Sequence, residues 1–381
     1  MATLPRPRML ASSIGLRQDK NGCTSNLLLN DFPRFELLPS CSMEEIKRPT
    51  IIDVARAARV GASTVSRHVR GGKSVSPEVA KRIGIAIAQL GYEPNTLARS
   101  LRVGRTQTLG VLFPHVNNVF FGNAIRTVQR EARRSGFTVM LLMHEEDAKL
   151  QQEQLASLKR SQVDGIILVP AAETNVAQVR ALLGNTPVVA LDRPLGSALD
   201  CVMLDNYMAG LQATEHLLWH KHRHIVSVTA PYKLHPLQSR LKGHEDAMDG
   251  AGKKVETIVW RDTEQLEGDL CLALQRKRSP ATAILSMSYS VTIAILSALH
   301  DRNIRLHEIG FIGIDDMEFA SFLDPSLTTV AQPAEQFAQL AVGQLLRRTA
   351  GATESPVQVI LPGNLIIRAS CGCNPALSKR R

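Results

Sequence analysis

The sequence of 381 residues predicts a small all-α domain near its N-terminus, followed by a larger α/β domain with parallel sheets. Apolar residues recur at helical spacing within residues 50–91, which predicts three short amphipathic helices. Residues 106–373 instead alternate short apolar runs with helix-length amphipathic stretches, a pattern typical of βαβ units. These 268 residues are more than one core usually fills, so we expect the α/β part to form two lobes.

The segment from residue 50 to residue 70 predicts two short helices joined by a tight turn. The apolar stripe of the first helix is Ile51, Val54, Ala55 and Ala58, and that of the second is Val65 and Val69. The outward side chains of the second helix are Ser63, Thr64, Ser66 and Arg67. Hydroxyls bond phosphate oxygens and an arginine can reach guanine O6 and N7, so this helix suits the major groove of DNA. The segment therefore predicts a helix-turn-helix.

Positive charge is concentrated in the same region. Residues 47–105 contain 12 Lys or Arg against three acidic residues, a net charge of +9, whereas the whole chain carries +10. Residues 106–381 hold 28 basic and 27 acidic residues, a net charge of +1. A charge run alone could be an ordinary solvated face, but the helical pattern beneath it favours a segment that binds a polyanion.

Two further helices are predicted downstream. Ser76 stands before a proline at the first helical position, and Gly91 ends this third helix. Its apolar face is formed by Val79, Ile83, Ile87 and Leu90. Asn95 can cap a fourth helix over residues 96–102. Isolated helices need roughly 12–15 residues, so we expect this short one to fold only against DNA or a second copy of the chain.

The order of these parts resembles the LacI/GalR family of bacterial transcription repressors over about residues 48–370. DVARAARVGASTVSRHV is similar to the family's helix-turn-helix, VSPEVAKRIGIAIAQLGYEPN to its third helix, and NTLARSLRVGRTQTLGV to its hinge helix and first strand. The resemblance implies base reading by Ala62, Ser63 and Arg67. It also implies phosphate contacts from Thr64, Ser66 and Asn95, and a minor-groove hinge at Ala98 and Leu101.

The resemblance divides the chain into five parts. These are a disordered extension over 1–47, a helix-turn-helix DNA-binding domain over 48–93, a hinge helix and linker over 94–105, a two-lobed effector-binding and dimerisation domain like that of periplasmic binding proteins over 106–373, and a basic tail over 374–381. The first residues lack the apolar core of a signal peptide. Met43 stands just before the DNA-binding domain and is a candidate for the true start.

Two departures from the family concern DNA binding. Arg59 stands at the turn position where the family usually has glycine, and a positive φ there would cost an arginine about 1 kcal/mol. Ala62 and Ser63 are short where relatives often carry longer polar side chains. The operator sequence of a relative therefore cannot be transferred to this chain.

The apolar runs expected to form strands fall into two sets. The first set is Leu109–Phe113, Phe137–Leu142, Gly165–Val169, Pro187–Leu191 and Val202–Asp205. The second is His224–Val228, Glu256–Val259, Ala283–Leu285 and Ile309–Gly313. The resemblance implies that the chain crosses between the lobes three times, near Asn206, Thr329 and Leu361.

Ligands of open parallel sheets bind beyond the carboxyl ends of the strands. Asp192 and Asp315 follow two such strands, and Arg240 opens a later helix, a combination that suits a polar, sugar-like ligand. By resemblance, Phe120 and Phe121 match the aromatic wall of the family's effector site, and Arg240 and Asp315 match the groups that grip the effector. The alternative interpretation is that the two phenylalanines are the core face of the first helix.

The effector site also departs from the family. Ser288 and Tyr289 stand where relatives show an Asn-Asp pair, and we include Tyr289 among the effector-binding residues. A further aromatic expected near Asp262 is Thr263, although Trp260 lies nearby. Because of these changes, the sequence predicts only the class of the ligand, a carbohydrate or a related small polar metabolite. It does not predict which ligand binds.

Three other groupings fall short of catalysis or metal binding. Gly72-Lys73-Ser74 ends like a phosphate-binding loop, but that motif's first glycine position is Arg67. His216 and His220 have the i, i+4 spacing of a zinc-binding helix without Cys or Glu at ligand spacing, which favours a helix end over a metal site. The adjacent Asp315 and Asp316 point to opposite faces of a strand. The six cysteines, at 23, 41, 201, 271, 371 and 373, are expected to be reduced thiols.

The sequence therefore predicts a non-enzymatic, cytoplasmic and nucleoid-associated transcription regulator without metal or cofactor. Its expected partners are a near-palindromic double-stranded DNA operator, a small carbohydrate-like effector and a second copy of the chain. No apolar run is long enough for a membrane span, and no heptad tail follows Arg368, so no coiled-coil tetramer is indicated. The alternative is a solute-binding or carbohydrate-modifying α/β protein without specific operator recognition.

Overall fold

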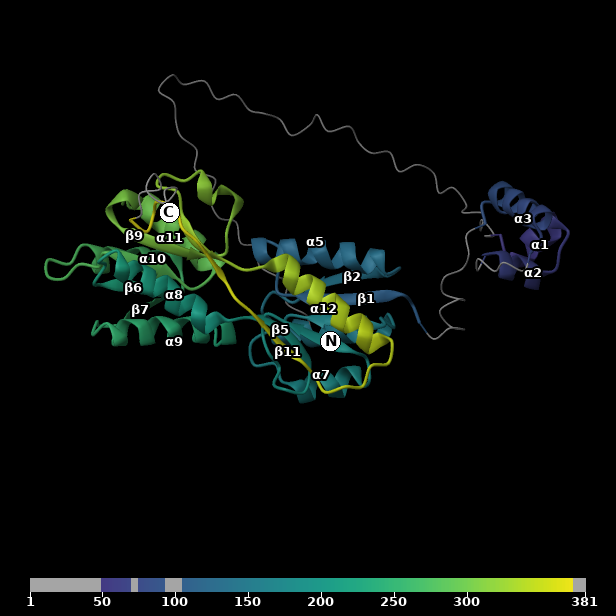
Figure 1. Ribbon diagram of the computed structural model, residues 1–381, viewed down its shortest axis with the longest axis horizontal. Coiled ribbons are helices and arrows are strands. Elements are labelled where there is room, and N and C mark those ends of the chain that lie inside the picture. Colours follow the sequence, from purple (N-terminus) through teal and green to yellow (C-terminus); the bar gives the residue numbers. More distant parts are fainter. Residues whose placement is uncertain (1–48, 70–74, 93–104, 373–381) are drawn as a thin grey trace, which may run out of the picture. The chain divides into compact units, whose positions relative to one another are not determined.

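The computed structural model describes residues 49–69, 75–92 and 105–372. The chain divides into two compact units, Met1–Pro94 and Asn95–Arg381 (Figure 1). The expected N-terminal extension, the hinge helix and the basic tail lie outside the described residues, as do Asn95, Ala98 and Leu101. None of the helices in the described part combines the length and apolar character that a membrane span requires.

In the described part of the N-terminal unit, three helices form a bundle. These are α1 (Ile51–Ala58), α2 (Ala62–Val69) and α3 (Pro77–Leu90). Thr50 and Asp53 form a capping box that starts α1, and the Ser76 side chain caps α3. The core contains Val54, Ala55, Ala58, Val65, Ile83, Ala86 and Tyr92. Leu90, expected on the apolar face of α3, is 38% exposed, because the small core made with α1 and α2 does not include it.

The second unit has two lobes, each built on a six-stranded sheet with the same pattern of strands. Lobe 1 has the order β11-β5-β4-β3-β1-β2, and lobe 2 the order β12-β10-β9-β8-β6-β7. The lobe 1 strands are β1 (Thr108–Phe113), β2 (Thr138–Met143), β3 (Gly165–Leu168), β4 (Val188–Leu191), β5 (Asp200–Leu204) and β11 (Gln358–Leu361). The lobe 2 strands are β6 (Ile225–Thr229), β7 (Glu256–Val259), β8 (Ala283–Ser286), β9 (Gly310–Ile314), β10 (Thr328–Ala331) and β12 (Asn364–Ile366). Every pairing is parallel except the one between β10 and β12.

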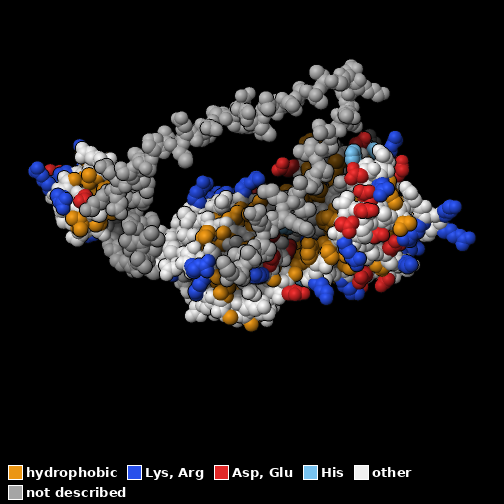
Figure 2. Space-filling model, turned by 180° about the vertical axis from the view of Figure 1, so that it is seen from behind, with side chains coloured by type: hydrophobic (Ala, Val, Ile, Leu, Met, Phe, Trp, Pro, Cys, Tyr) orange, Lys and Arg blue, Asp and Glu red, His pale blue; other side chains and the backbone are white. Residues whose placement is uncertain are grey.

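Helices cover both sheets. Those of lobe 1 are α5 (Val119–Arg134), α6 (Ala148–Arg160), α7 (Val176–Leu183) and α12 (Ala334–Thr349). Those of lobe 2 are α8 (Asn206–Trp219), α9 (His235–Gly250), α10 (Thr263–Leu274) and α11 (Tyr289–Asp301), with the short 3-10 helices η1 (Leu306–Glu308) and η2 (Glu318–Ser321). Figure 2 shows acidic and basic side chains interspersed on the surface of lobe 2, which agrees with the small net charge of residues 106–381.

All nine expected runs form strands, and β10, β11 and β12 complete the two sheets. The last two were missed because they are edge strands of four and three residues that are largely exposed. The chain crosses between the lobes from β5 to α8, from β10 to α12 and from β11 to β12 (Figure 1). These crossings lie close to the three positions that the family resemblance implies.

The close contact of α8 with α9 depends on two glycines. A Cβ at Gly210 would lie 2.0 Å from the carbonyl oxygen of Arg240, and one at Gly243 would lie 2.1 Å from that of Tyr207. No real Cβ can be so close to a backbone atom, so glycine at both positions allows the two helix backbones to touch. This contact fixes where α9 places the side chain of Arg240.

Candidate DNA-binding and effector-binding sites

The second helix of the N-terminal unit has one buried and one open face. Val65 packs into the core, whereas Ser63 and Arg67 are exposed. Ala62, Thr64 and Ser66 are partly buried along the same helix. The Arg67 Nε donates to the carbonyl of Ser63 at 3.4 Å, so its guanidinium lies along the open face of α2. This arrangement leaves a short hydroxyl and a long cation available to a DNA groove.

The turn before this helix requires a left-handed residue. Arg59 has φ 54° and ψ 49°, and its N–H donates to the carbonyls of Ala55 and Arg56. Only glycine adopts this conformation without strain, and an L-residue with a Cβ loses roughly 1 kcal/mol or more. Arg59 therefore has the positive φ at which an arginine is strained and a glycine is not.

The first part of the effector-site candidate follows β4. Asp192 has φ 65° and is buried, and the neighbouring Arg193 is also buried. Two nitrogens of Arg193 bind the carboxylate of Glu146 at 2.6 and 2.8 Å, and Nη1 also donates to the carbonyl of Pro170. Burial raises the pKa of Asp192, although the charges of Arg193 and Arg240 oppose the shift.

The second part follows β9 in lobe 2. Asp315 is buried with φ 68° and accepts a hydrogen bond from Gln332 Nε2 at 2.7 Å. It also accepts one from Asn118 Nδ2 at 3.4 Å. Asn118 belongs to lobe 1, so this bond joins the lobes. Burial raises the pKa of Asp315, with Arg240 as the largest opposing influence.

Arg240 interacts electrostatically with both of these carboxylates. It is 3% exposed, and its Nη1 donates to the carbonyl of Met287 at 2.8 Å. The charges of Asp315 and Asp192 favour its ionised form, whereas burial lowers its pKa. The buried Nε has no hydrogen-bond partner among the residues that the structure describes. A buried donor without a partner is costly, so it is available to an acceptor on a small ligand.

The two phenylalanines of the expected aromatic wall lie in the lobe 1 core. Phe120 is 4% exposed and its ring lies 5.2 Å from that of Phe337, between centroids. Phe121 is 5% exposed and lies 5.6 Å from Phe113 and 5.7 Å from His115. This packing agrees with the alternative interpretation, in which the two phenylalanines form the core face of their helix. Contact of these rings with an effector stays a prediction.

Tyr289 begins α11, where it is partly buried against the core of lobe 2. Trp260 is partly buried against the same core, and its indole Nε1 has no hydrogen-bond partner in the protein. The effector role of Tyr289 stays a prediction.

Sequence reasoning missed several polar groups of this site. They are Glu146, His235 and Gln332. Asn118 and Arg193, which the sequence places after the first and fourth strands, belong to the site as well. Gln332 lies in a crossing between the lobes, and only the topology brings it to Asp315. His235 starts α9, and its pKa is lowered by burial although Asp192 raises it.

Two other places in the second unit lie apart from this site. A hollow of about 680 Å³, lined by residues that include Arg105, Lys159 and Asp164, is at the amino ends of the lobe 1 strands. It is open to solvent and lacks the buried charges found between the lobes, so we do not assign the effector to it. Among the described residues, a group that could hold a metal ion is at the amino end of the lobe 2 sheet.

The comparisons with known proteins agree with both halves of the chain. Residues 50–95 match the model described as bacterial regulatory proteins of the lacI family. Residues 106–358 match the model of periplasmic binding proteins and the sugar-binding domain of the LacI family.

Among characterised relatives, the ribose operon repressor of Escherichia coli K12 is 30% identical over 84% of this chain and 99% of its own. The transcriptional repressor PurR of Aliivibrio fischeri is 30% identical over 78% of this chain and 91% of its own.

Solved structures show the same fold. A complex of the transcriptional regulator CelR with cellobiose is 28% identical, with a TM-score of 0.61, and covers 85% of this chain and all of its own. A Lac repressor dimer bound to operator is 22% identical, with a TM-score of 0.74, and covers 85% of this chain and 99% of its own. At that identity the likeness concerns the fold. From the two family models and the full-length relatives, the chain belongs to the LacI family of bacterial regulatory proteins.

Proposed function

We propose that this protein is a transcription repressor that binds a near-palindromic operator as a dimer and is controlled by a sugar or a related small polar metabolite. The observation that carries the proposal is the pairing, in one chain, of an exposed recognition helix with a buried Asp-Arg-Asp group between two lobes. Relatives of the same family include a ribose operon repressor, and a neighbouring structure holds cellobiose.

In the DNA-binding unit, we assign base reading to Ala62, Ser63 and Arg67. Thr64 and Ser66 are partly buried on the same helix, and their hydroxyls suit phosphate contacts. Asn95, Ala98 and Leu101 complete the DNA site as proposals from the family resemblance. Arg67 is the residue with the reach for a guanine edge, so it should contribute most of the discrimination.

In the effector site, we assign the polar contacts to Asp192, Arg240 and Asp315. Buried carboxylates and a guanidinium can bind sugar hydroxyls through charge-assisted hydrogen bonds, which are stronger than neutral ones. Phe120, Phe121 and Tyr289 are assigned as the apolar surroundings of the ligand.

Control of DNA binding would follow from the position of this site between the lobes. Asp315 is bonded to Asn118 of lobe 1 and interacts with Arg240 of lobe 2. A ligand that binds one lobe arrangement better than another shifts the population of arrangements by the difference in affinity. In this proposal the Asp315 carboxylate binds the ligand and also forms the hydrogen bond that joins the two lobes.

We propose that the protein acts in the cytoplasm, at the nucleoid. We also propose that it has no catalytic role. The adjacent carboxylates Asp315 and Asp316 have separate partners. Asp316 pairs with Arg368 at 2.7 Å and accepts from Thr329, whereas Asp315 faces the lobe interface. A pair of carboxylates that acts as general acid and general base must face the same reacting group, and these two do not.

Selection of bound duplexes from a random DNA pool, at several salt concentrations, tests the operator proposal. A near-palindrome should be enriched by the parent protein, and Arg67→Ala should lose discrimination of about 1–3 kcal/mol at one position of each half-site. Uniform binding that falls steeply with salt would contradict specific recognition.

Calorimetry with ribose, cellobiose and a purine base then tests the effector class. A change in operator affinity on adding one of the sugars would support the proposal. Binding of the purine base alone would overturn the sugar assignment.

A further inference from the structure

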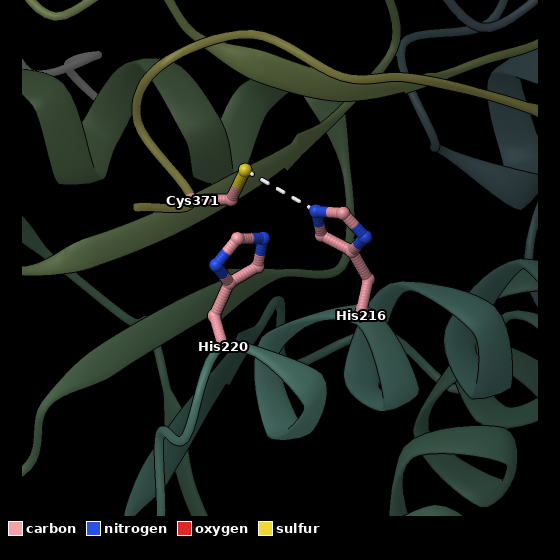
Figure 3. Close-up of side chains that lie close together, drawn as sticks. All are labelled: His216, His220 and Cys371. Atoms are coloured by element: carbon pink, nitrogen blue, oxygen red, sulfur yellow. Dashed lines mark hydrogen bonds between the residues drawn. The ribbon is translucent and has the colours of Figure 1, made fainter. Parts of the chain in front are cut away.

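Three side chains with metal-binding donors meet in lobe 2, away from the effector site. His216 lies in the last turn of α8, His220 directly follows this helix, and Cys371 lies in the C-terminal segment beyond β12 (Figure 3). Nε2 of His216 is 3.2 Å from Sγ of Cys371. One ligand atom from each of the three residues lies within 4.8 Å of the other two. The sequence separation of 155 residues between His216 and Cys371 explains why spacing alone did not reveal the group.

The group lies at the amino ends of the lobe 2 strands. The nearby His222 bonds through Nδ1 to Thr282, which precedes β8, and its Nε2 would lie 2.5 Å from a Cβ at Gly310, where β9 begins. The effector-site candidate lies beyond the carboxyl ends of the same sheet. The two sites therefore use opposite ends of lobe 2 and share no residue.

We propose that His216, His220 and Cys371 form a three-ligand site for a divalent transition metal of the Zn²⁺ class, with the fourth position open to water. One thiolate and two imidazoles are donors that zinc prefers, and zinc is usually four-coordinate. Bonds of about 2.0–2.3 Å in tetrahedral geometry would place the donor atoms about 3.3–3.6 Å apart. In the structure the ligand atoms lie within 4.8 Å of one another, and water can complete the coordination.

The surroundings of Cys371 hold its sulfur in place. Thr328 Oγ1 donates to Cys371 Sγ at 3.2 Å, and Sγ donates to the carbonyl of Arg368 at 3.4 Å. The preceding Ser370 is anchored to β9, since its Oγ donates to the carbonyl of Phe311 at 2.6 Å and its carbonyl accepts from the Phe311 N–H at 2.7 Å. Cys371 itself is fully buried, whereas His216 and His220 are partly exposed. A metal could thus enter from the side of the two rings.

A metal at this position would tie the C-terminal segment to α8. This helix begins at Asn206, where the chain enters lobe 2, and ends at the histidines. The cross-link would therefore stabilise lobe 2 between its first helix and its last segment. Metal binding adds its free energy to folding whenever the unfolded chain binds the ion more weakly.

Cobalt titration of the metal-free, full-length protein tests the site, in a background in which Cys23, Cys41 and Cys373 are replaced by serine. The remaining thiols are Cys201, Cys271 and Cys371, and the Cys371→Ser variant assigns the thiolate signal. We expect a thiolate-to-cobalt absorption in the near ultraviolet and the intense visible bands of tetrahedral Co²⁺. The exposed ring of Trp219 lies 4.7 Å from that of His220, between centroids, so its fluorescence should be quenched by the same titration.

The variants separate a metal site from a packing contact. Cys371→Ser should abolish the thiolate absorption, and His220→Gln should weaken cobalt binding at least tenfold. The matched control is Cys271→Ser, which removes a partly exposed thiol on α10 and should leave both signals unchanged. Zn²⁺ should raise the urea midpoint of lobe 2 in the parent and in this control, but not in Cys371→Ser or His220→Gln.

Two outcomes would overturn the proposal. The first is no thiolate absorption in the parent background. The second is the same absorption in Cys371→Ser. Because Cys371 is buried, its variant could unfold, so the metal-free urea midpoints are compared first. His216→Gln and His220→Gln, whose side chains are partly exposed, then carry the test without disturbing the core.

Discussion

Asp192 and Asp315 occupy equivalent positions in the two lobes. Each directly follows the third strand in its sheet order, β4 in lobe 1 and β9 in lobe 2. Each is buried, and each has a left-handed backbone, with φ of 65° and 68°. Strained backbone in buried charged residues is concentrated at functional sites. The repeated architecture of the lobes thus delivers two carboxylates to the same interface, where Arg240 interacts with both.

Replacing Arg240 tests this relationship. We expect Arg240→Gln to destabilise lobe 2 by about 3 kcal/mol at pH 7, because buried Asp315 loses its neighbouring cation and buried Asp192 keeps only Arg193. It should also abolish effector binding. Urea titration followed by the fluorescence of Trp219 and Trp260, both in lobe 2, measures the first effect, and calorimetry the second.

The loss should be smaller at low pH. Burial already raises the pKa values of both carboxyls, so the folded variant binds protons more tightly than the unfolded chain, and its stability falls as pH rises. The control is Lys242→Gln on the same helix. It removes an exposed ion pair with Asp246 and should leave stability nearly unchanged. Effector binding retained by Arg240→Gln would contradict the assignment.

The contact of α8 with α9 predicts a sharp effect of one methyl group. Gly210→Ala should destabilise lobe 2 by about 1–3 kcal/mol, because the new Cβ would overlap the backbone of Arg240 and force α9 away. Effector affinity should fall with it, since α9 carries Arg240. Gly250→Ala is the matched control, at a position of α9 where an added Cβ meets nothing within 4 Å. Equal stability of the two variants would show that the helices are not in this contact.

His244 predicts an acid-sensitive lobe 2. Thr214 donates its hydroxyl hydrogen to Gly210, so it accepts from His244 Nδ1, and Nε2 is left buried without a partner. Burial lowers the pKa of His244 from 6.5 to about 4. Between these pH values His244 is protonated in the unfolded chain and neutral in the folded chain. Stability should therefore fall by about 3 kcal/mol as pH drops from 6.5 to about 4.

The measurement for His244 is the urea midpoint of lobe 2 across that pH range. His244→Gln can keep the hydrogen bond to Thr214 without titrating, so its midpoint should depend less on pH. His300→Gln removes an exposed histidine and should behave like the parent. An unchanged pH profile in His244→Gln would assign the acid sensitivity to other groups.

Arg59→Gly should stabilise the N-terminal unit. Glycine removes the strain of the left-handed turn, about 1 kcal/mol, although its greater freedom in the unfolded chain offsets part of this gain. Hydrogen exchange of the amides of α1 in the full chain reports this local stability. Arg56→Gly, in the exposed last turn of α1, should have the opposite sign, with a loss of about 1 kcal/mol. Faster exchange in Arg59→Gly than in the parent would refute the prediction.

Local patterns in the sequence determined the helices of the N-terminal unit, the open face of α2 and nine of the twelve strands. They did so because apolar periodicity, caps and turn residues act over a few neighbouring positions. The same reasoning located Asp192 and Asp315 at the ends of their strands, since strand ends can be read from where apolar runs stop. Arg240, expected to open a helix, instead lies inside α9, because this helix already begins at His235.

Contacts between distant segments were decided by the tertiary structure. Phe120 and Phe121 are apolar in any interpretation, and only the packing of α5 against α12 and β1 placed them in the core. Gln332 reaches Asp315, and Cys371 reaches His216, because the chain crosses between the lobes three times before it reaches Cys371 in lobe 2. Such partners depend on strand order and crossover topology, which are set by the burial of whole sheets and not by neighbouring residues.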